Sequence, residues 1–269
     1  MDRVSAATNG VRRRFRTIWI SDVHLGTRGC NAKLLTDFLD HTDSDTLYLV
    51  GDIIDGWRMK KRFYWPAGHN DVVWRVMKRA KRGTRVVYIP GNHDEMFRQF
   101  TGMNFGGVEI RRKAIHDTAD GRKLLVLHGD EFDAIMLAHR WLAVVGDHAY
   151  EWLMRLNVVV NRVRAWLKLP YWSLSKHAKH KVKNAVAFIS RFEEVVAHEA
   201  GMRGVDGVVC GHIHNAEMRE IAGVTYYNDG DWVESCTALV EHFDGRMEIL
   251  HWAEEVARRS APAPLRIAA

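Results

Sequence analysis

The sequence predicts an α/β protein, and three observations lead to that prediction. Short apolar runs alternate with stretches of helical periodicity, which is the pattern of strands and crossover helices in a parallel sheet. Each apolar run ends in polar residues. Two Asp-Gly pairs, Asp120-Gly121 and Asp244-Gly245, separate further strand-like runs and predict β-hairpins. A second, antiparallel portion of sheet is therefore expected to complete a sandwich.

Five apolar runs predict strands that are buried on both faces, because they are short, β-rich and continuous. They are residues 17–20 (TIWI), 46–50 (TLYLV), 85–90 (RVVYIP), 123–127 (KLLVL) and 207–210 (GVVC). In open α/β sheets the ligand crevice lies beyond the carboxyl ends of the strands. The polar residues that follow each run are expected at that edge.

Two segments between these runs have the periodicity of amphipathic helices, residues 31–41 and residues 71–83. Asn31 is the predicted N-cap of the first, and Gly83 is expected to end the second. Their apolar faces comprise Leu34, Leu35, Phe38 and Leu39 in the first and Val72, Val73, Val76, Met77 and Ala80 in the second.

The alternation stops at residues 131 to about 200, which are helical in pattern and rich in tryptophan. This segment is predicted to be a helical insertion, a lid, between the fourth and fifth strands. The expected organisation is a flexible segment over 1–15, a single domain over 16–258 that contains the insertion, and a loose C-terminal tail over 259–269.

Composition favours a cytoplasmic protein with anionic partners. The chain has 269 residues with 39 basic and 33 acidic side chains, a net charge of +6. Its three cysteines, Cys30, Cys210 and Cys236, are odd in number and far apart, which disfavours a disulfide framework and a cysteine-based zinc site. No secretory signal and no apolar stretch of roughly 20 residues is evident.

Polar clusters at the five strand ends predict a metal site. A single aspartate or histidine at a strand end is more often a hydrogen-bonded loop residue, but five clusters at successive strand ends favour shared ligands. Carboxylate, amide oxygen and imidazole suit Mn, Fe or Zn, and two divalent ions roughly 3.5–4 Å apart can clamp a transferring phosphoryl group. The clusters are Asp22-x-His24, Asp52-x-x-Asp55, Asn92-His93-Asp94, His128-Gly129-Asp130 and His212-x-His214.

These motifs, in this order from Asp22 to His214, resemble those of the calcineurin-like metallophosphoesterase superfamily. The resemblance implies a four-layer α/β/β/α sandwich and two divalent metal ions, with Mn expected first and Fe, Zn or Mg left open. It implies one ion held by Asp22, His24, Asp52 and His214, and a second held by Asp52, Asn92, His128 and His212, with Asp52 bridging.

The resemblance also assigns roles around the metal ligands. His93 is expected to contact the phosphate and to assist the leaving group, and Asp94 is expected to orient His93. Asp55 and Asp130 are expected to be supporting hydrogen-bond partners or loop residues. The roles of Asp229, Asp231 and Trp232 stay open.

The placement of the insertion and the overall length resemble the UDP-2,3-diacylglucosamine pyrophosphatase family of lipid A biosynthesis. That resemblance implies cleavage of a UDP-linked diacyl sugar to UMP and a lipid monophosphate at the cytoplasmic face of the inner membrane. Two departures indicate a related branch and leave the substrate open. The motif reads GNHD, with His93 where the best-known members have arginine, and residues 228–234 (NDGDWVE) also differ.

Two basic, aromatic stretches are candidates for substrate or membrane contact, although a solvated basic face is the alternative for each. Between Arg155 and Lys183 there are eight basic residues and no acidic ones. The candidate residues are Arg58, Lys60, Lys61 and Arg62 after the Asp52 loop, and Trp166, Trp172, Lys176, Lys179 and Lys183 in the insertion.

The predicted substrate is thus a small amphiphilic, phosphate-containing molecule, with no protein partner implied. A nucleotide phosphodiesterase or nuclease on the same metal site is the alternative. The basic excess favours it, but nucleic acid is disfavoured because no DNA-binding module is evident. A non-enzymatic scaffold is disfavoured because every ligand position is filled, and a protein phosphatase because its motif usually ends in glutamate.

Overall fold

The computed structural model describes residues 12–133 and 175–260, with side chains from residue 188 onward in the second range. Residues 1–130 and 197–269 form one compact unit, and residues 131–196 form a second. The predicted tryptophan-rich part of the insertion, with Trp166 and Trp172, lies outside the described residues. None of the described helices has the length and hydropathy that a membrane span requires.

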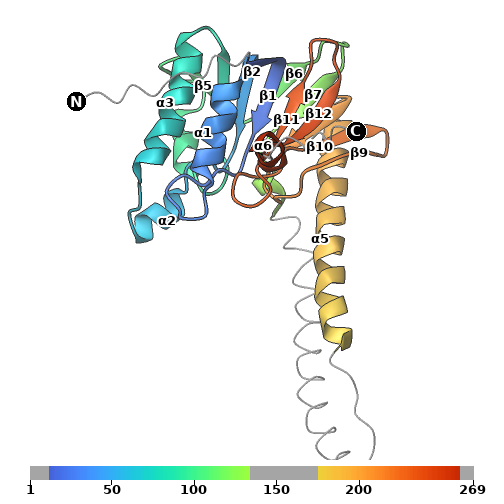
Figure 1. Cartoon of the computed structure of the whole chain (residues 1–269). Coiled ribbons are helices and arrows are strands. Elements are labelled where there is room, and N and C mark those ends of the chain that lie inside the picture. Colours follow the sequence, from blue (N-terminus) through green and yellow to red (C-terminus); the bar gives the residue numbers. More distant parts are fainter. Residues whose placement is uncertain (1–11, 134–174, 261–269) are drawn as a thin grey trace, which may run out of the picture. The chain divides into compact units, whose positions relative to one another are not determined.

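The first unit contains a seven-stranded sheet with the strand order β12-β11-β1-β2-β3-β5-β4. Strands β1, β2, β3 and β5 run parallel, and the others pair antiparallel (Figure 1). The bounds are β1 Arg13–Ile20, β2 Thr42–Val50, β3 Arg85–Ile89, β4 Asn104–Phe105, β5 Val108–Ile110, β11 Thr237–Glu241 and β12 Met247–His251.

A five-stranded sheet with the order β6-β7-β8-β10-β9 packs against the first sheet. Its central strands β7, β8 and β10 are parallel, and β6 and β9 pair antiparallel at its edges. The bounds are β6 Ala114–Asp117, β7 Lys123–Val126, β8 Gly207–Cys210, β9 Glu217–Ile221 and β10 Val224–Asn228.

Helices α1, α3 and α6 pack on the outer face of the seven-stranded sheet, and the end of α5 packs on the five-stranded sheet, as in an α/β/β/α sandwich. The bounds are α1 Ala32–His41, α2 Gly56–Lys61, α3 Ala67–Lys81, α5 Ser175–Met202 and α6 Trp252–Ser260, with 3-10 helices η1 Glu95–Phe100 and η2 Asp130–Phe132. Near the end of α5, an added Cβ at Gly201 would lie 3.6 Å from Val224 of β10, so this end packs on the five-stranded sheet.

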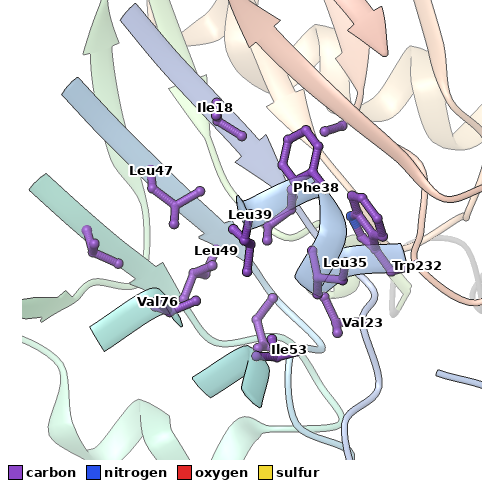
Figure 2. Close-up of a cluster of buried hydrophobic side chains, with 14 of the residues drawn as sticks. Ile18, Val23, Leu35, Phe38, Leu39, Leu47, Leu49, Ile53, Val76 and Trp232 are labelled. Atoms are coloured by element: carbon purple, nitrogen blue, oxygen red, sulfur yellow. The ribbon is translucent and has the colours of Figure 1, made fainter. Parts of the chain in front are cut away.

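Successive side chains of β1 point to opposite faces of its sheet, and each face is part of a separate hydrophobic core. Ile18 and Ile20 face the helices, where they join a cluster that includes Leu35 and Phe38 of α1. Figure 2 shows Ile18 together with these two residues of α1. Trp19 faces the opposite sheet, and its ring stacks on Tyr48 at 5.7 Å. Strands with apolar residues on both faces are thus buried from both sides.

All five predicted strands and both predicted hairpins are present, but several boundaries differ. Strand β1 begins at Arg13, inside the segment predicted to be flexible, because residues 13–15 pair with residues 42–44 of β2. Helix α6 extends to Ser260, past the predicted start of the tail. Asn31 is at the N-cap position of α1, but its side chain donates to the carbonyl of Val233 instead of capping the helix.

Candidate metal centre

The predicted polar clusters meet at one edge of the two sheets. Five strands, β1, β2 and β3 of one sheet and β7 and β8 of the other, end there. Because the carboxyl ends of parallel strands lie along one edge, the residues that follow them converge. The converging residues are Asp22 and His24 after β1, Asp52 after β2, Asn92 and His93 after β3, His128 after β7, and His212 and His214 after β8.

Asp22 and Asp52 are the centre of this cluster, and both are buried. Oδ1 of Asp22 lies 3.1 Å from Nε2 of His214, 3.7 Å from Nε2 of His128 and 3.9 Å from Nε2 of His24. Oδ2 of Asp52 lies 3.7 Å from the same nitrogen of His128. The two carboxylates therefore share one imidazole between them, a geometry that places several donor atoms around a common centre.

Three overlapping groups of side chains bring one donor atom each to within 4.8 Å of the others. The groups are Asp22, His24 and His214; Asp22, Asp52 and His128; and His24, Asp52 and His93. His212 is in none of them, but its ring centroid lies 5.1 Å from that of His128, and its backbone N–H donates to Asp22 Oδ2 at 2.9 Å.

Three buried atoms of the predicted metal ligands have no hydrogen-bond partner among the described residues: Oδ1 of Asp22, Oδ1 of Asn92 and Nε2 of His128. Buried polar atoms are almost always paired, since an unpaired one costs about 1–3 kcal/mol. A cation would satisfy all three atoms. The oxygen and imidazole donors fit divalent Mn, Fe or Zn.

The electrostatics of the cluster also favour a cation. Burial lowers the pKa of His128, but the carboxylates of Asp130, Asp22 and Asp52 outweigh burial and hold that pKa well above its usual value. Burial raises the pKa of Asp22, but His128 and His214 outweigh it and hold that pKa well below its usual value. The carboxylates thus create a field that stabilises positive charge between them.

The backbone of the cluster is in a conformation that few residues adopt. Five of the converging residues have positive φ: Asp22 (49°), His24 (52°), Asp52 (52°), His212 (71°) and His214 (52°). Non-glycine residues in the left-handed region are uncommon and cost about 1–3 kcal/mol each. Such strain concentrates at functional sites, because the surrounding structure must hold it in place.

Glycines of the motifs let neighbouring loops approach the cluster closely. A Cβ added at Gly91 would lie 2.6 Å from Nδ1 of His128 and closer still to Asp52. At Gly211 it would lie 2.5 Å from Oδ2 of Asp22. Real Cβ atoms do not make contacts this short, so these positions require glycine for close approach.

Asp55 connects two histidines of the cluster. Its Oδ2 lies 3.2 Å from Nδ1 of His24 and 3.1 Å from Nδ1 of His93. Its Oδ1 accepts a hydrogen bond from the backbone N–H of Arg58 at 2.7 Å and so caps α2. Burial raises the pKa of Asp55, but the Arg58 N–H and His93 outweigh it, so that pKa is lowered. Asp55 supports the site, as the sequence predicted.

Asp94 was predicted to orient His93, and its contacts show that this prediction is wrong. Its carboxylate does not face His93; it accepts hydrogen bonds from the backbone N–H groups of Gly91 (2.6 Å) and Ile53 (2.8 Å) and from the hydroxyl of Tyr88 (2.5 Å). Asp94 is fully buried and ties the loop after β2 to the loop after β3. Adjacent residues of a tight turn point in different directions, so proximity in sequence was misleading.

Asp130 supports His128, since its Oδ1 lies 3.1 Å from Nδ1 of that ring, and it also accepts from Arg98 at 2.6 Å. No role for Ser21 was predicted, but its hydroxyl lies 2.5 Å from Asp22 Oδ2 and 2.6 Å from Asp229 Oδ1. Ser21 directly precedes Asp22, and this position was the only signal for its role.

The residues of the segment 228–234 have distinct positions. Asp229 is buried behind Ser21, and burial raises its pKa well above the usual value. Asp231 accepts from the backbone N–H groups of Val233 (2.7 Å) and Glu234 (2.5 Å) and so shapes the turn. Trp232 is fully buried in the hydrophobic core beside Phe38.

Helix α2 brings a basic, aromatic surface to the cluster. Gly56 at its start donates to the carbonyl of His93 at 2.9 Å, and the exposed ring of Trp57 lies 4.5 Å from the ring of His93. The predicted substrate residues Arg58, Lys60, Lys61 and Arg62 follow Trp57 and are exposed. Lys176, Lys179 and Lys183 lie in α5, where side chains are not described.

Comparisons with known proteins agree with this geometry. The model of the calcineurin-like phosphoesterase family matches residues 15–216. A UDP-2,3-diacylglucosamine hydrolase of Shewanella sp. is 24% identical over 86% of this chain and 95% of its own. One of Xanthomonas campestris is 25% identical over 85% of this chain and 96% of its own.

The solved structures that match the chain are more distant in sequence. Vps29 from Entamoeba histolytica is 12% identical, covers 87% of this chain and 97% of its own, and has a TM-score of 0.41. The E. coli phosphoesterase YfcE is 12% identical, covers 88% of this chain and 98% of its own, and has a TM-score of 0.40. Because the family model matches most of the chain, the chain belongs to the calcineurin-like phosphoesterase family.

Proposed function

We propose that this phosphoesterase hydrolyses a diphosphate or phosphoester bond in a UDP-2,3-diacylglucosamine-like or other lipid- or nucleotide-linked substrate. The observation that supports it most is the pair of buried carboxylates, Asp22 and Asp52, that face one imidazole, His128, whose Nε2 has no hydrogen-bond partner among the described residues. The relatives named UDP-2,3-diacylglucosamine hydrolase support the substrate class.

We assign two divalent ions to the cluster, with Mn²⁺ the expected metal. One ion is assigned to Asp22, His24, Asp52 and His214, and the other to Asp52, Asn92, His128 and His212. The group of Asp22, His24 and His214 supports the first assignment, and the unpartnered oxygen of Asn92 supports the second. When bound, such a pair polarises phosphoryl oxygens and supplies a nucleophile at neutral pH.

His93 is assigned to the phosphoryl group and the leaving oxygen. Its side chain is one-quarter exposed, and its Nε2 lies 4.0 Å from Asp52 Oδ2, at the open side of the cluster. Its Nδ1 faces Asp55, so a proton there holds the ring and leaves Nε2 for the substrate. Four exposed cations after Trp57 would attract the negative charge of a diphosphate.

A nucleotide phosphodiesterase is the second candidate, and the exposed ring of Trp57 beside His93 favours it, because a flat aromatic face can stack on a base. In either case the basic chain would meet an anionic substrate, and with a lipid substrate it would act peripherally at the cytoplasmic face of a membrane.

The test is release of UMP from UDP-2,3-diacylglucosamine by Mn-loaded protein in mild detergent. We expect release by the wild type, none by Asp52→Ala, and wild-type release by Asp45→Ala, a control at a partly exposed surface aspartate. Unchanged release by Asp52→Ala would exclude the proposed site. Cleavage of bis-p-nitrophenyl phosphate without UMP release would retain the phosphoesterase and reject this substrate.

A further inference from the structure

An apolar cavity of about 510 Å³ lies beneath helix α3, within the first unit. Strands β2, β3 and β5 form its floor, and α3, η1 and the β4–β5 hairpin form its walls. Leu49, Ile53 and Val76, which line it, are drawn among the buried side chains in Figure 2. Protein interiors are close-packed, and an apolar cavity of about 150 Å³ already binds benzene. A cavity of this size therefore needs an explanation.

The covering of β3 and β5 explains why the space is open. Helix α1 follows β1 and α3 follows β2, but the connection from β3 to β5 carries only the six-residue η1 and the two-residue β4. The turn of the hairpin is pressed against α3, since a Cβ added at Gly107 would lie 3.1 Å from that of Ala80. Phe97 and Phe100 of η1 line the cavity on this side and do not fill it.

The chemistry of the lining selects an apolar occupant. The hydroxyl of Tyr88 is the one polar side-chain group in the lining, and it donates to Asp94. A polar ligand would lose its hydrogen bonds to water without replacement. Val73 and Phe105 are lining residues that are 37% and 49% exposed, so the cavity opens between α3 and the hairpin. An elongated aliphatic group fits both the lining and the opening.

The loops that carry the predicted metal ligands also contribute side chains to the cavity lining. Leu25 directly follows His24, and Ile53 and Ile54 lie between Asp52 and Asp55; all three line the cavity. We propose that this cavity binds one aliphatic chain of the substrate whose phosphate is held at the metal centre. That the chain belongs to the substrate rests on the proposed function, whereas the preference for an alkyl chain rests on the cavity alone.

The test is calorimetric binding of octyl, decyl and dodecyl phosphate to the Mn-loaded, full-length protein. Each added pair of methylenes should tighten binding about tenfold if it enters the cavity. Val73→Trp should fill the opening and reduce that gain to less than threefold, and Ile115→Trp should retain it. Ile115 is a suitable control because it is 49% exposed on β6 and does not line the cavity.

A second variant should strengthen the binding of a longer chain, and a misfolded protein would not show such a gain. Met77→Ala should enlarge the cavity and extend the gain to tetradecyl phosphate. An equal gain per methylene pair in the wild type and in Val73→Trp would overturn the proposal. Binding is measured without turnover, so failure to hydrolyse the UDP-linked lipid would leave this result unaffected.

The source of the chain is tested by inhibition. Dodecyl phosphate should compete with bis-p-nitrophenyl phosphate, because its phosphate and the substrate's phosphate share the metal centre. Binding in the cavity without competition would show that the chain comes from a separate lipid, and would overturn the assignment to the substrate.

Discussion

Nδ1 of His93 lies 3.1 Å from Oδ2 of Asp55, a residue 38 positions earlier in the chain, and not beside its neighbour Asp94. The same carboxylate oxygen lies 3.2 Å from Nδ1 of His24. One buried carboxylate thus positions a proposed metal ligand and the proposed phosphate contact together. Any movement of Asp55 should disturb metal binding and the contact to phosphate at once.

Asp55→Asn should lower kcat about 10- to 100-fold, which is typical of losing a group that orients metal ligands. The amide keeps the size of the side chain but loses the charge that faces both imidazoles. The measurement is Mn-dependent hydrolysis of bis-p-nitrophenyl phosphate together with the metal content of the purified protein. Asp45→Asn, at a partly exposed aspartate, is the control. Wild-type kcat in Asp55→Asn would show that the two contacts have no effect on catalysis.

Asp94→Ala should destabilise the fold by about 3 kcal/mol or more, because it leaves three backbone N–H groups and the hydroxyl of Tyr88 without their acceptor. The measurement is urea unfolding of the metal-free protein, which separates folding from metal binding. Asp244→Ala, at an exposed turn, should change stability by less than about 0.5 kcal/mol. Loss of activity in Asp94→Ala without loss of stability would restore the predicted catalytic role.

Local patterns were sufficient to predict the sheets and most of the site. Four site residues each lie two positions beyond the end of a buried strand: Asp22, Asp52, His128 and His212. The apolar runs predict the strands, and the polar residues that follow them are therefore predicted to lie close together. The orientation of Asp94 could not be predicted this way, because it depends on Ile53 and Tyr88, which only the fold brings to it.

The elements that the sequence did not predict are those that depend on distant pairing. The polar start of β2 at Thr42 has no strand-like pattern, and it is extended because it pairs with Arg13 of β1. Strand β4 is two residues long and forms only through its hairpin with β5. Helix α2 begins at a glycine and is capped by Asp55, whose other carboxylate oxygen lies beside His24 and His93.

Gly91→Ala should lower metal affinity at least tenfold. Gly91 does not have positive φ, so alanine adds no backbone strain, and the added methyl group would contact Asp52 and lie 2.6 Å from His128. Both side chains must move away from their present positions. Gly68→Ala in α3 is the matched control, since its methyl group would lie 3.9 Å from the nearest atom and alanine favours a helix. Calorimetric titration with Mn²⁺ measures the effect, and equal affinities for the two variants would contradict it.

Glu241 should make stability depend on acid pH. It is fully buried on β11 and accepts hydrogen bonds from Arg16 (2.7 Å) and Thr17 (2.9 Å) of its own sheet. Its Oε2 also lies 2.8 Å from Nε2 of His116, which belongs to the other sheet. Burial raises the pKa of Glu241, but His116, the Ala119 N–H, Arg16 and Thr17 outweigh it and lower that pKa from 4.5 to about 2.

Because the folded-state pKa lies below the unfolded value, the carboxylate stabilises the fold above pH 4.5, and this stabilisation is lost as the pH falls toward 2. The shift corresponds to about 3 kcal/mol at neutral pH. Urea unfolding at pH 7 and pH 3 should show a loss for the wild type that Glu241→Gln lacks. Glu109→Gln, at an exposed pair with Arg85, should cost less than about 1 kcal/mol at pH 7. The same decline between the two pH values in Glu241→Gln would show that other groups cause acid unfolding.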